Sequence, residues 1–379
     1  MLKGTHVGIA SGGTGGHFYP ALATALEWQR RGHPVTMLVS GQNAAEHLVL
    51  ASQHGIPART LPSWRLEASP LRLALFPFRM FQACWTARRV LRELGCGAVL
   101  GMGSFAAIPG CLAARTLGLP LFLHEGNCRP GRANRLLART ARAMAISLPL
   151  ESGTRLPCAC VHTGLPLRQA IVEAAAAPPP SRAELCQEFG LNPDRLTLLV
   201  FGGSQGAQAI NRLVLRTLQS LPDGATLKSR LQLIHLTGQD DNAELVQGYR
   251  EAGIPACVKA RDQRIDRAYL LADLTLCRSG ASTVSELALF RKPAVFIPLP
   301  SAADDHQSSN ARAAAAIGGG DWRPQAQATP EWLAATLESW SRDSEAWRQR
   351  AEGLGALAVG NAASRIADML EAELALKGH

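Results

Sequence analysis

The chain has 379 residues, of which 47% are hydrophobic and 18% charged, a composition typical of globular proteins and not of disordered ones. This length exceeds what one hydrophobic core usually supports, so we expect two domains. The formal net charge of +9 favours an anionic partner, such as a nucleotide, a nucleic acid or an acidic membrane surface, and does not choose among them.

The cysteines and the uncharged stretches exclude several other classes. Nine cysteines are scattered without a CxxC pair, which favours reduced packing residues over disulfides or a zinc site. The apolar run after Lys3 is too short for a signal peptide. Residues 94–114 carry no charge, but their five glycines and Pro109 indicate strand, loop and small-residue helix, not a membrane span.

Short apolar runs alternate with segments of helical spacing in the first half, which predicts βαβ units and a parallel sheet. Strands are expected at 6–10, 35–39, 98–102, 120–124 and 143–147. Helices are expected at 19–31, 43–54, 76–94, 105–117 and 131–140.

The second half repeats this pattern after a proline-rich connector at 173–185. LTLLVFGGSQGAQAIN (196–211) reads as a buried strand, a glycine turn and a helix, and further strands are expected at 231–236, 256–260, 274–278 and 294–298. The chain is therefore predicted to be an α/β protein, with two doubly wound, Rossmann-like parallel-sheet domains that face a ligand-binding cleft. The residues from Glu338 onwards are expected to form amphipathic helix that packs back across the domain junction.

Two glycine-rich turns open the two halves, SGGTGGHFYP (11–20) and FGGSQG (201–206). Glycine lets backbone N–H groups approach an oxyanion, and a helix that starts next adds its dipole, so the pair predicts a polyphosphate ligand. A redox dinucleotide site would need GxGxxG and an acid after the next strand, whereas position 18 is Phe and that strand ends Val39-Ser40. Neither loop has the GK[ST] of a nucleotide triphosphatase.

Three further stretches are polar where a strand is expected to end. SGASTVSE (279–286) brings Glu286 to the start of a helix, where a carboxylate either caps the helix or accepts hydrogen bonds from two ribose hydroxyls. PLPSAADDHQSSNA (298–311) is dense in side chains that can bond sugar hydroxyls as donors and acceptors, and HEGN (124–127) ends a strand in polar groups.

Seven motifs occur in one order along nearly the whole chain: GGTGGHFYPALA, VLGMGSFAAIPG, HEGNCRPGRANR, GLPLR, FGGSQGAQAIN, CRSGASTVSEL and DDHQSSNA. In this the chain resembles the MurG family, the UDP-N-acetylglucosamine–N-acetylmuramyl-(pentapeptide) pyrophosphoryl-undecaprenol N-acetylglucosaminyltransferases of peptidoglycan synthesis. The resemblance implies a GT-B fold and a hexosyltransferase that makes lipid II from lipid I. It also implies an acceptor and membrane-associating domain at 1–163, a linker and connecting helix at 164–195, a UDP-sugar donor domain at 196–340 and returning C-terminal helices at 341–379.

The resemblance also assigns roles to individual residues. On the donor side, Glu286 would hold the ribose, Asp262 would lie at the uracil, and Ser204 and Arg168 would meet the diphosphate. His306 and Gln307 would contact the N-acetylglucosamine, and Asn127 would reach the donor from the other domain. The loop Thr14, Gly15 and Gly16 is implied in donor and acceptor binding, chiefly at the acceptor diphosphate, with His17 and Phe105 also on the acceptor side.

The sequence departs from the family pattern at three motifs. This chain has HEGN where the family has HEQN, Ser104-Phe105 where it has Gly-Tyr, and GLPLR where it has GNPVR. The unusual residues are therefore Gly126, Ser104 and Leu165. All three lie in the implied acceptor side or linker, so they bear on the acceptor more than on the donor.

Transfer from an α-linked UDP-sugar to a β-linkage inverts the anomeric centre, and a single in-line displacement suffices. We expect His17 to be the base, with Glu125 as its rival. The unperturbed pKa of a histidine suits that task, and His17 is equally suited to binding an acceptor phosphate. Helix dipoles, backbone N–H groups and Arg168 can stabilise the departing UDP, and no DxD-like motif follows a strand. No cofactor or obligatory metal is expected.

Residues 64–92 combine six arginines with Leu, Phe, Met and Trp and a single acid, the composition of an interfacial patch that binds anionic lipid. A core helix with a solvated basic face is the alternative. We expect a peripheral protein at the cytoplasmic face of the bacterial inner membrane.

Two other functions remain open from sequence. A related GT-B enzyme would use another lipid acceptor or UDP-sugar. A nucleic-acid-binding module would need aromatic side chains interleaved with the basic ones, whereas the chain has three tyrosines and its basic residues are dispersed outside 64–92, so no nucleic acid partner is expected.

Overall fold

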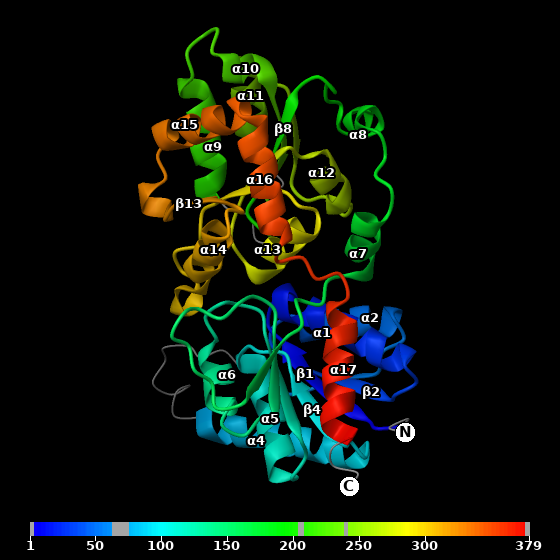
Figure 1. Ribbon diagram of the computed structural model, residues 1–379. Coiled ribbons are helices and arrows are strands. Elements are labelled where there is room, and N and C mark those ends of the chain that lie inside the picture. The colour runs from blue at the N-terminus through cyan, green and yellow to red at the C-terminus, as the bar shows by residue number, and fades with distance from the viewer. Residues whose placement is uncertain (1–3, 63–75, 204–207, 239–241, 376–379) are drawn as a thin grey trace. The chain divides into compact units, whose positions relative to one another are not determined.

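The computed structural model describes residues 4–62, 76–203, 208–238 and 242–375 (Figure 1). The chain divides into two compact units. The first unit consists of Met1–Gln169 together with Val359–His379, and the second unit is Ala170–Ala358.

The first unit is built on a parallel sheet with the strand order β3-β2-β1-β4-β5-β6-β7 among the described residues. The strands are β1 (Val7–Gly12), β2 (Val35–Ser40), β3 (Ala58–Thr60), β4 (Ala98–Gly101), β5 (Leu121–Glu125), β6 (Ala143–Ile146) and β7 (Ala159–His162). The helices are α1 (Gly15–Arg30), α2 (Ala44–Gln53), α4 (Phe76–Glu93), η1 (Phe105–Ala107), α5 (Ile108–Thr116), α6 (Arg132–Leu137) and α17 (Ala362–Ala375). Because β1 lies between β2 and β4, the chain winds outwards in both directions from β1, and the loop after β1 is at the switch point where such sheets bind ligands.

Both faces of this sheet are covered, which explains the nearly continuous apolar strands. Successive strand residues point to opposite faces, so Val7 and Ile9 enter one core while Ala10 enters the other. The first core lies under α1 and includes Ile366 and Leu370 of α17, and the second lies under α4 and α5. Figure 1 shows α17, in red, lying beside α1 although more than 300 residues separate them in sequence.

The second unit repeats the architecture with the parallel order β10-β9-β8-β11-β12-β13. Its strands are β8 (Leu196–Phe201), β9 (Leu231–Leu236), β10 (Ala256–Lys259), β11 (Leu274–Cys277), β12 (Ala294–Phe296) and β13 (Gly320–Trp322). Its helices are α7 (Gln169–Ala176), α8 (Arg182–Phe189), α9 (Gln208–Ser220), α10 (Thr226–Arg230), α11 (Ala243–Glu251), α12 (Ile265–Leu271), α13 (Ala281–Leu289), η2 (Ala303–Asp305), α14 (His306–Ala316), η3 (Gln325–Gln327), α15 (Pro330–Arg342) and α16 (Ser344–Gly355).

Each strand predicted from an apolar run is present, with slightly different ends. The short strands β3, β7 and β13 were not predicted because each has only three or four residues and lies at or near a sheet edge, where a neighbour's hydrogen bonds define the strand more than its own pattern does. The prediction for the first helix was wrong at its start: α1 begins at Gly15, not at residue 19. Pro20 is therefore inside the helix, and the full burial of Phe18 against the core stabilises this early turn.

The units divide the C-terminal region at a different place from the expected boundary at 340/341. Helix α16 packs on α13, α15 and β13, so residues up to Ala358 belong to the second unit. Only the segment from Val359 groups with the first unit, because α17 supplies apolar side chains to its core.

Candidate functional site

The first glycine-rich loop joins β1 to α1 and has a backbone that only glycine tolerates at its start. Gly12 has φ 148° and Gly13 φ 83°, and a Cβ on Gly12 would lie 1.9 Å from the carbonyl oxygen of Ser40. Thr14 is the N-cap of α1, its side chain makes no capping hydrogen bond, and the first turn contains no acidic residue. The backbone N–H groups at the start of α1 thus form the kind of site that binds an oxyanion.

His17 lies in the first turn of α1, and its tautomer is fixed by the backbone of the neighbouring strand connection. Its ring Nδ1 is 3.0 Å from the carbonyl oxygen of Met102. A carbonyl oxygen only accepts, so Nδ1 carries the proton and Nε2 of the neutral ring carries the lone pair. A Cβ on Gly103 would lie 3.4 Å from Nδ1, so the Gly103 backbone packs closely on the imidazole. This tautomer is the one that a general base acting through Nε2 requires.

Glu125 ends β5 with a buried carboxylate that organises the loop after it. Glu125 is only 4% exposed. Oε1 accepts from the backbone N and from Nδ2 of Asn127, at 3.0 and 3.1 Å. Oε2 accepts from the Gly131 backbone N and from Nδ2 of Asn134, both at 2.9 Å. Four N–H donors on a buried carboxylate are the signature of a structural anchor, which leaves Glu125 poorly placed to take a proton from a substrate.

Asn134 and His124 complete this network. Nδ2 of Asn134 also donates to the backbone carbonyl of His124 at 2.9 Å, which ties α6 to the end of β5. Burial, with a smaller contribution from nearby His17, lowers the pKa of His124 to about 3, so its ring is neutral. His124 Nε2 is hydrogen-bonded to the Ser147 hydroxyl at 2.9 Å. The sequence analysis missed Asn134 because a polar residue inside an expected helix gives no signal of its role.

Arg168 is half-buried and Phe105 is exposed in the first unit. The guanidinium carbon of Arg168 is 5.6 Å from the ring centroid of Tyr19, a cation–π contact that brings Arg168 to the beginning of α1. Phe105 is 39% exposed, and its ring centroid is 5.9 Å from that of Phe76 on α4.

In the second unit, Glu286 lies on the second turn of α13, and the capping interpretation is therefore wrong. The N-cap of α13 is Gly280, and its first turn contains no acidic residue. Oε2 of Glu286 instead accepts a hydrogen bond of 2.7 Å from the hydroxyl of Tyr269, on α12. Sequence analysis did not identify Tyr269, since a tyrosine on an apolar helix face is usually a packing residue.

Asp262 follows β10 and its side chain is used within its own turn. Oδ2 is 2.8 Å from Nζ of Lys259, and Oδ1 accepts from the backbone N of Arg264 at 2.9 Å. Burial alone would raise the pKa of Asp262, but the hydrogen bonds from Lys259 and Arg264 hold that pKa below its usual value. These bonds fix the backbone of the turn, which suits recognition through main-chain groups.

His306 and Gln307 begin α14, and Gln307 is held from two strand ends. Its Oε1 accepts from the backbone N of Leu299 at 3.0 Å, and its carbonyl oxygen accepts from the Ser279 hydroxyl at 2.8 Å. Because the hydrogen bond from Leu299 identifies and holds Oε1, the position of the Nε2 amide group of Gln307 is set as well. Nδ1 of His306 is 2.7 Å from the carbonyl oxygen of Ala303, which places the proton of the neutral ring on Nδ1.

Arg278, which directly follows β11 in the motif CRSG, supports the same loops. Its buried guanidinium donates to the carbonyl oxygens of Ile297 and Pro298, both at 3.0 Å, and to Oε1 of Gln325 at 2.7 Å. The loops after β12 and β13 are thus fastened to β11. Ser204, the residue expected at the diphosphate, lies outside the described residues.

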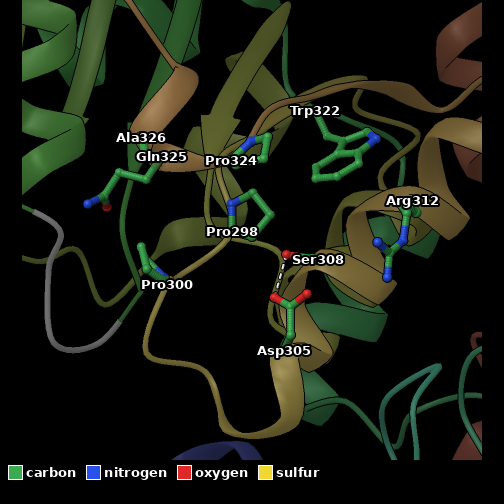
Figure 2. A pocket seen from close by; sticks show the side chains of 9 residues that line it. All are labelled: Pro298, Pro300, Asp305, Ser308, Arg312, Trp322, Pro324, Gln325 and Ala326. Carbon is green, nitrogen blue, oxygen red and sulfur yellow. Dashed lines mark hydrogen bonds between the residues drawn. The ribbon is translucent and has the colours of Figure 1, made fainter.

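A pocket of about 320 Å³ lies between the loops after β12 and β13 and the start of α14 (Figure 2). Trp322 and Pro298 form apolar walls, and Asp305, whose carboxylate accepts from the Ser308 hydroxyl at 2.6 Å, lies at its lower rim in the view. Neither His306 nor Gln307 is among the residues that line this pocket.

The described part of the predicted membrane patch, 76–92, is helix α4. Phe78, Phe81 and Trp85 are 68%, 68% and 55% exposed and follow the i, i+3, i+7 spacing of one helix face. Residues 64–75 of the patch lie outside the described residues. None of the helices in the described part of the chain is long and apolar enough to cross a membrane. Among the described residues, no three His, Cys, Asp or Glu side chains gather in an arrangement that would hold a metal ion.

Comparison with known proteins identifies matching domains in both halves of the chain. Residues 7–146 match the glycosyltransferase family 28 N-terminal domain, and residues 197–367 match the glycosyltransferase family 28 C-terminal domain. The UDP-N-acetylglucosamine--N-acetylmuramyl-(pentapeptide) pyrophosphoryl-undecaprenol N-acetylglucosamine transferase of Magnetococcus marinus is 36% identical over 372 residues, 97% of each chain. The protein of the same name from Azotobacter vinelandii is 37% identical over 94% of each chain.

Solved structures agree with these relatives. The crystal structure of Acinetobacter baumannii MurG matches with a TM-score of 0.77 at 31% identity and covers 97% of this chain and 99% of its own. The calicheamicin glycosyltransferase CalG4, at 16% identity and a TM-score of 0.70, shares the fold. The two family 28 domains and the near full-length relatives show that this chain belongs to the MurG family of glycosyltransferase family 28, with the GT-B fold.

Proposed function

We propose that this protein transfers N-acetylglucosamine from UDP-N-acetylglucosamine to the 4-hydroxyl of the muramyl residue of lipid I, and so makes lipid II for peptidoglycan synthesis. The observation that carries the proposal is identity of 36% to 38% to transferases of that name over nearly the whole chain. The fixed Nε2 lone pair of His17, beside an anion-binding helix start, supports it chemically.

The second unit holds the donor in this proposal. Glu286 accepts from the ribose hydroxyls, and the turn at Asp262 meets the uracil through its backbone. Gln307 and His306 contact the sugar hydroxyls, with Gln307 donating through its oriented amide group. Ser204, Arg168 and Asn127 are assigned to donor binding by the resemblance to the family.

The first unit holds the acceptor. Thr14, Gly15 and Gly16 bind its diphosphate through the N–H groups at the start of α1, with a contribution to the donor as well. Phe105 provides an exposed apolar surface beside this loop.

His17 is the base in the displacement. The acceptor 4-oxygen attacks the anomeric carbon, the bond from that carbon to the UDP oxygen breaks, and the hydroxyl proton passes to Nε2 of His17. The Met102 carbonyl keeps its hydrogen bond to Nδ1–H and stabilises the imidazolium that forms. Glu125 holds the loop after β5 in place. UDP leaves with the electron pair, and no obligatory metal is invoked.

A transfer assay tests the function and the base together. Radiolabelled UDP-N-acetylglucosamine is incubated with a short-chain lipid-linked muramyl acceptor, with and without chelator. We expect transfer in both arms, and a loss of about 100-fold or more in kcat for His17→Ala at saturating acceptor. A near-normal kcat would leave His17 as a phosphate ligand only. Transfer to diacylglycerol and not to the muramyl acceptor would favour the related lipid glycosyltransferase.

We further propose that α4 docks the protein on an anionic membrane surface, at the cytoplasmic face of the bacterial inner membrane. The exposed stripe Phe78, Phe81 and Trp85 would enter the interface, with the arginines of α4 at the lipid phosphates. Replacement of the three aromatics by serine should release the protein from vesicles that contain anionic lipid. Leu136→Ser removes an apolar side chain that is 61% exposed on α6 and should not release it. Unchanged binding of the triple variant, or equal binding to neutral vesicles, would contradict the proposal.

A further inference from the structure

Tyr269 is a fully buried tyrosine in the second unit, and its hydroxyl contacts the carboxylate of Glu286. The residue is 0% exposed, and its hydroxyl donates to Oε2 of Glu286 at 2.7 Å. Glu286 itself is half-buried. The two residues come from different helices, α12 and α13, which are separated in sequence by β11.

The aromatic ring of Tyr269 is held on two sides. Its centroid is 5.9 Å from that of Phe201, at the end of β8, in an edge-on arrangement. The ring of Phe290, which follows α13, is tilted at 5.2 Å. Such aromatic pairs prefer defined geometries, so the packed ring holds the hydroxyl oxygen in one position.

A hydrogen bond to one carboxylate oxygen restricts the rotation of the whole group. The flexible side chain of Glu286 has several rotamers, and a ligand that bonds two neighbouring hydroxyls needs one of them. A charge-assisted bond from a fixed donor selects that rotamer before the ligand arrives.

We infer that Tyr269 is a positioning residue that aims the Glu286 carboxylate at a ribose, and that the protein therefore discriminates ribonucleotides from 2′-deoxyribonucleotides. The inference rests on the proposed role of Glu286 in donor binding. A site built to bond a hydroxyl rejects the analogue that lacks it, because the analogue displaces water from the carboxylate without replacing the hydrogen bond that the hydroxyl would make.

Tyr249 offers a matched control in the same unit. It is 1% exposed, and its hydroxyl is 2.7 Å from Nδ1 of His235, so Tyr249→Phe removes an equally buried hydroxyl from an equally short hydrogen bond. Neither Tyr249 nor His235 belongs to the proposed donor-binding residues.

The experiment measures the Kd of UDP and of 2′-deoxy-UDP by calorimetry for the full-length wild type, Tyr269→Phe and Tyr249→Phe, with the melting temperature of each. Wild type should bind UDP more tightly than 2′-deoxy-UDP. Tyr269→Phe should raise the Kd of UDP roughly tenfold and the Kd of 2′-deoxy-UDP much less. The ratio of the Kd of 2′-deoxy-UDP to that of UDP should therefore fall towards one. In the transfer assay, the KM for UDP-N-acetylglucosamine should rise more than kcat falls.

The outcomes separate the inference from the function on which it rests. A wild-type protein that binds UDP but shows no preference over 2′-deoxy-UDP would remove the ribose role of Glu286. If Tyr269→Phe keeps the wild-type preference for UDP over 2′-deoxy-UDP, the proposed role of Tyr269 is wrong. If Tyr249→Phe lowers the ratio as much as Tyr269→Phe does, the effect is loss of packing and the inference is wrong.

Discussion

Ser104 has a backbone conformation that side chains rarely adopt. With φ 61° and ψ 162° it lies in a region that is essentially restricted to glycine, and glycine is the usual residue of the resembled family at this position. Its hydroxyl donates to the carbonyl oxygen of Gly12 at 3.3 Å, which links the turn after β4 to the first glycine-rich loop. The hydrogen bond offsets part of the strain.

The strain predicts an unusual order of stabilities. Ser104→Ala keeps the strained backbone and loses the hydrogen bond, whereas Ser104→Gly relieves the strain. We expect the glycine variant to have a free energy of unfolding about 1 kcal/mol above that of the alanine variant in urea titrations. At Ser52, an exposed position in α2, the order should reverse because alanine is the better helix former. An alanine variant as stable as the glycine variant at position 104 would show that no strain is stored there.

The carboxylate of Glu125 permits a test that separates an anchor from a base. Glu125→Gln puts an NH₂ group where four N–H donors already converge, so we expect a loss of about 1.5 to 3 kcal/mol of stability. The pH–rate profile of this variant should keep its acid limb, whereas that of His17→Gln should lose it. Retained stability with an abolished acid limb would instead make Glu125 the base.

At the scale of secondary structure, α17 completes the first unit from the far end of the chain. Arg31, just after α1, donates to Asp368 at 2.7 Å and to Glu371 at 2.8 Å, and also to the carbonyl oxygen and hydroxyl of Ser364. Beneath these contacts, Ile366 and Leu370 are fully buried in the core under α1. Apolar burial contributes most of this attachment, because the carboxylates that pair with Arg31 are 63% and 33% exposed and their ion pairs are screened by water.

Removing a buried side chain from α17 should therefore destabilise the first unit, although the rest of that unit is formed by residues 1–169. Leu370→Ala is expected to lower the stability of the first unit by about 2 to 5 kcal/mol, measured as a shift of its thermal transition. The control Leu136→Ala changes a leucine that is 61% exposed and should cost less than about 0.5 kcal/mol. Equal shifts for both variants would mean that α17 contributes little to the core.

At the scale of the whole molecule, each unit has its own core and each buries a neutral histidine. Burial lowers the pKa of His124, in the first unit, and of His235, in the second, to about 3. His235 lies between the Tyr249 hydroxyl and Oδ1 of Asn211, at 2.7 and 3.0 Å, and only a neutral ring accepts from one and donates to the other.

These two histidines predict acid sensitivity in both units. Their folded pKa lies below the unfolded value of about 6.5, so between these values the unfolded chain binds more protons and stability falls as pH falls. At pH 5.5 each histidine should lower the free energy of unfolding by about 1.4 kcal/mol relative to the value above pH 7. Thermal melts at pH 7.5 and 5.5 should show a smaller drop for His235→Gln than for wild type. The exposed control His54→Gln should show the wild-type drop, and a wild-type drop in His235→Gln would contradict the prediction.

The sequence by itself determined the elements that have a local signal. Apolar runs and helical spacing predicted the strands and most helices, because side-chain burial repeats with a fixed period in each. The ordered motifs predicted the family that the comparisons confirmed, whereas ligand binding at the glycine-rich loops stays a prediction. The short strand β7 and the early start of α1 have no such signal, since neighbouring elements define them.

Only the tertiary structure decided how the polar groups pair. Nothing near Glu125 in sequence shows that Asn134 satisfies its carboxylate, and nothing near Glu286 points to Tyr269 on the preceding helix. The Met102 carbonyl that fixes the tautomer of His17 lies 85 residues away along the chain. Hydrogen bonds depend on distances between atoms of different elements, which packing sets and residue order does not record. A residue's type therefore stated what chemistry it can do, and its partners in space decided which of these roles fits it.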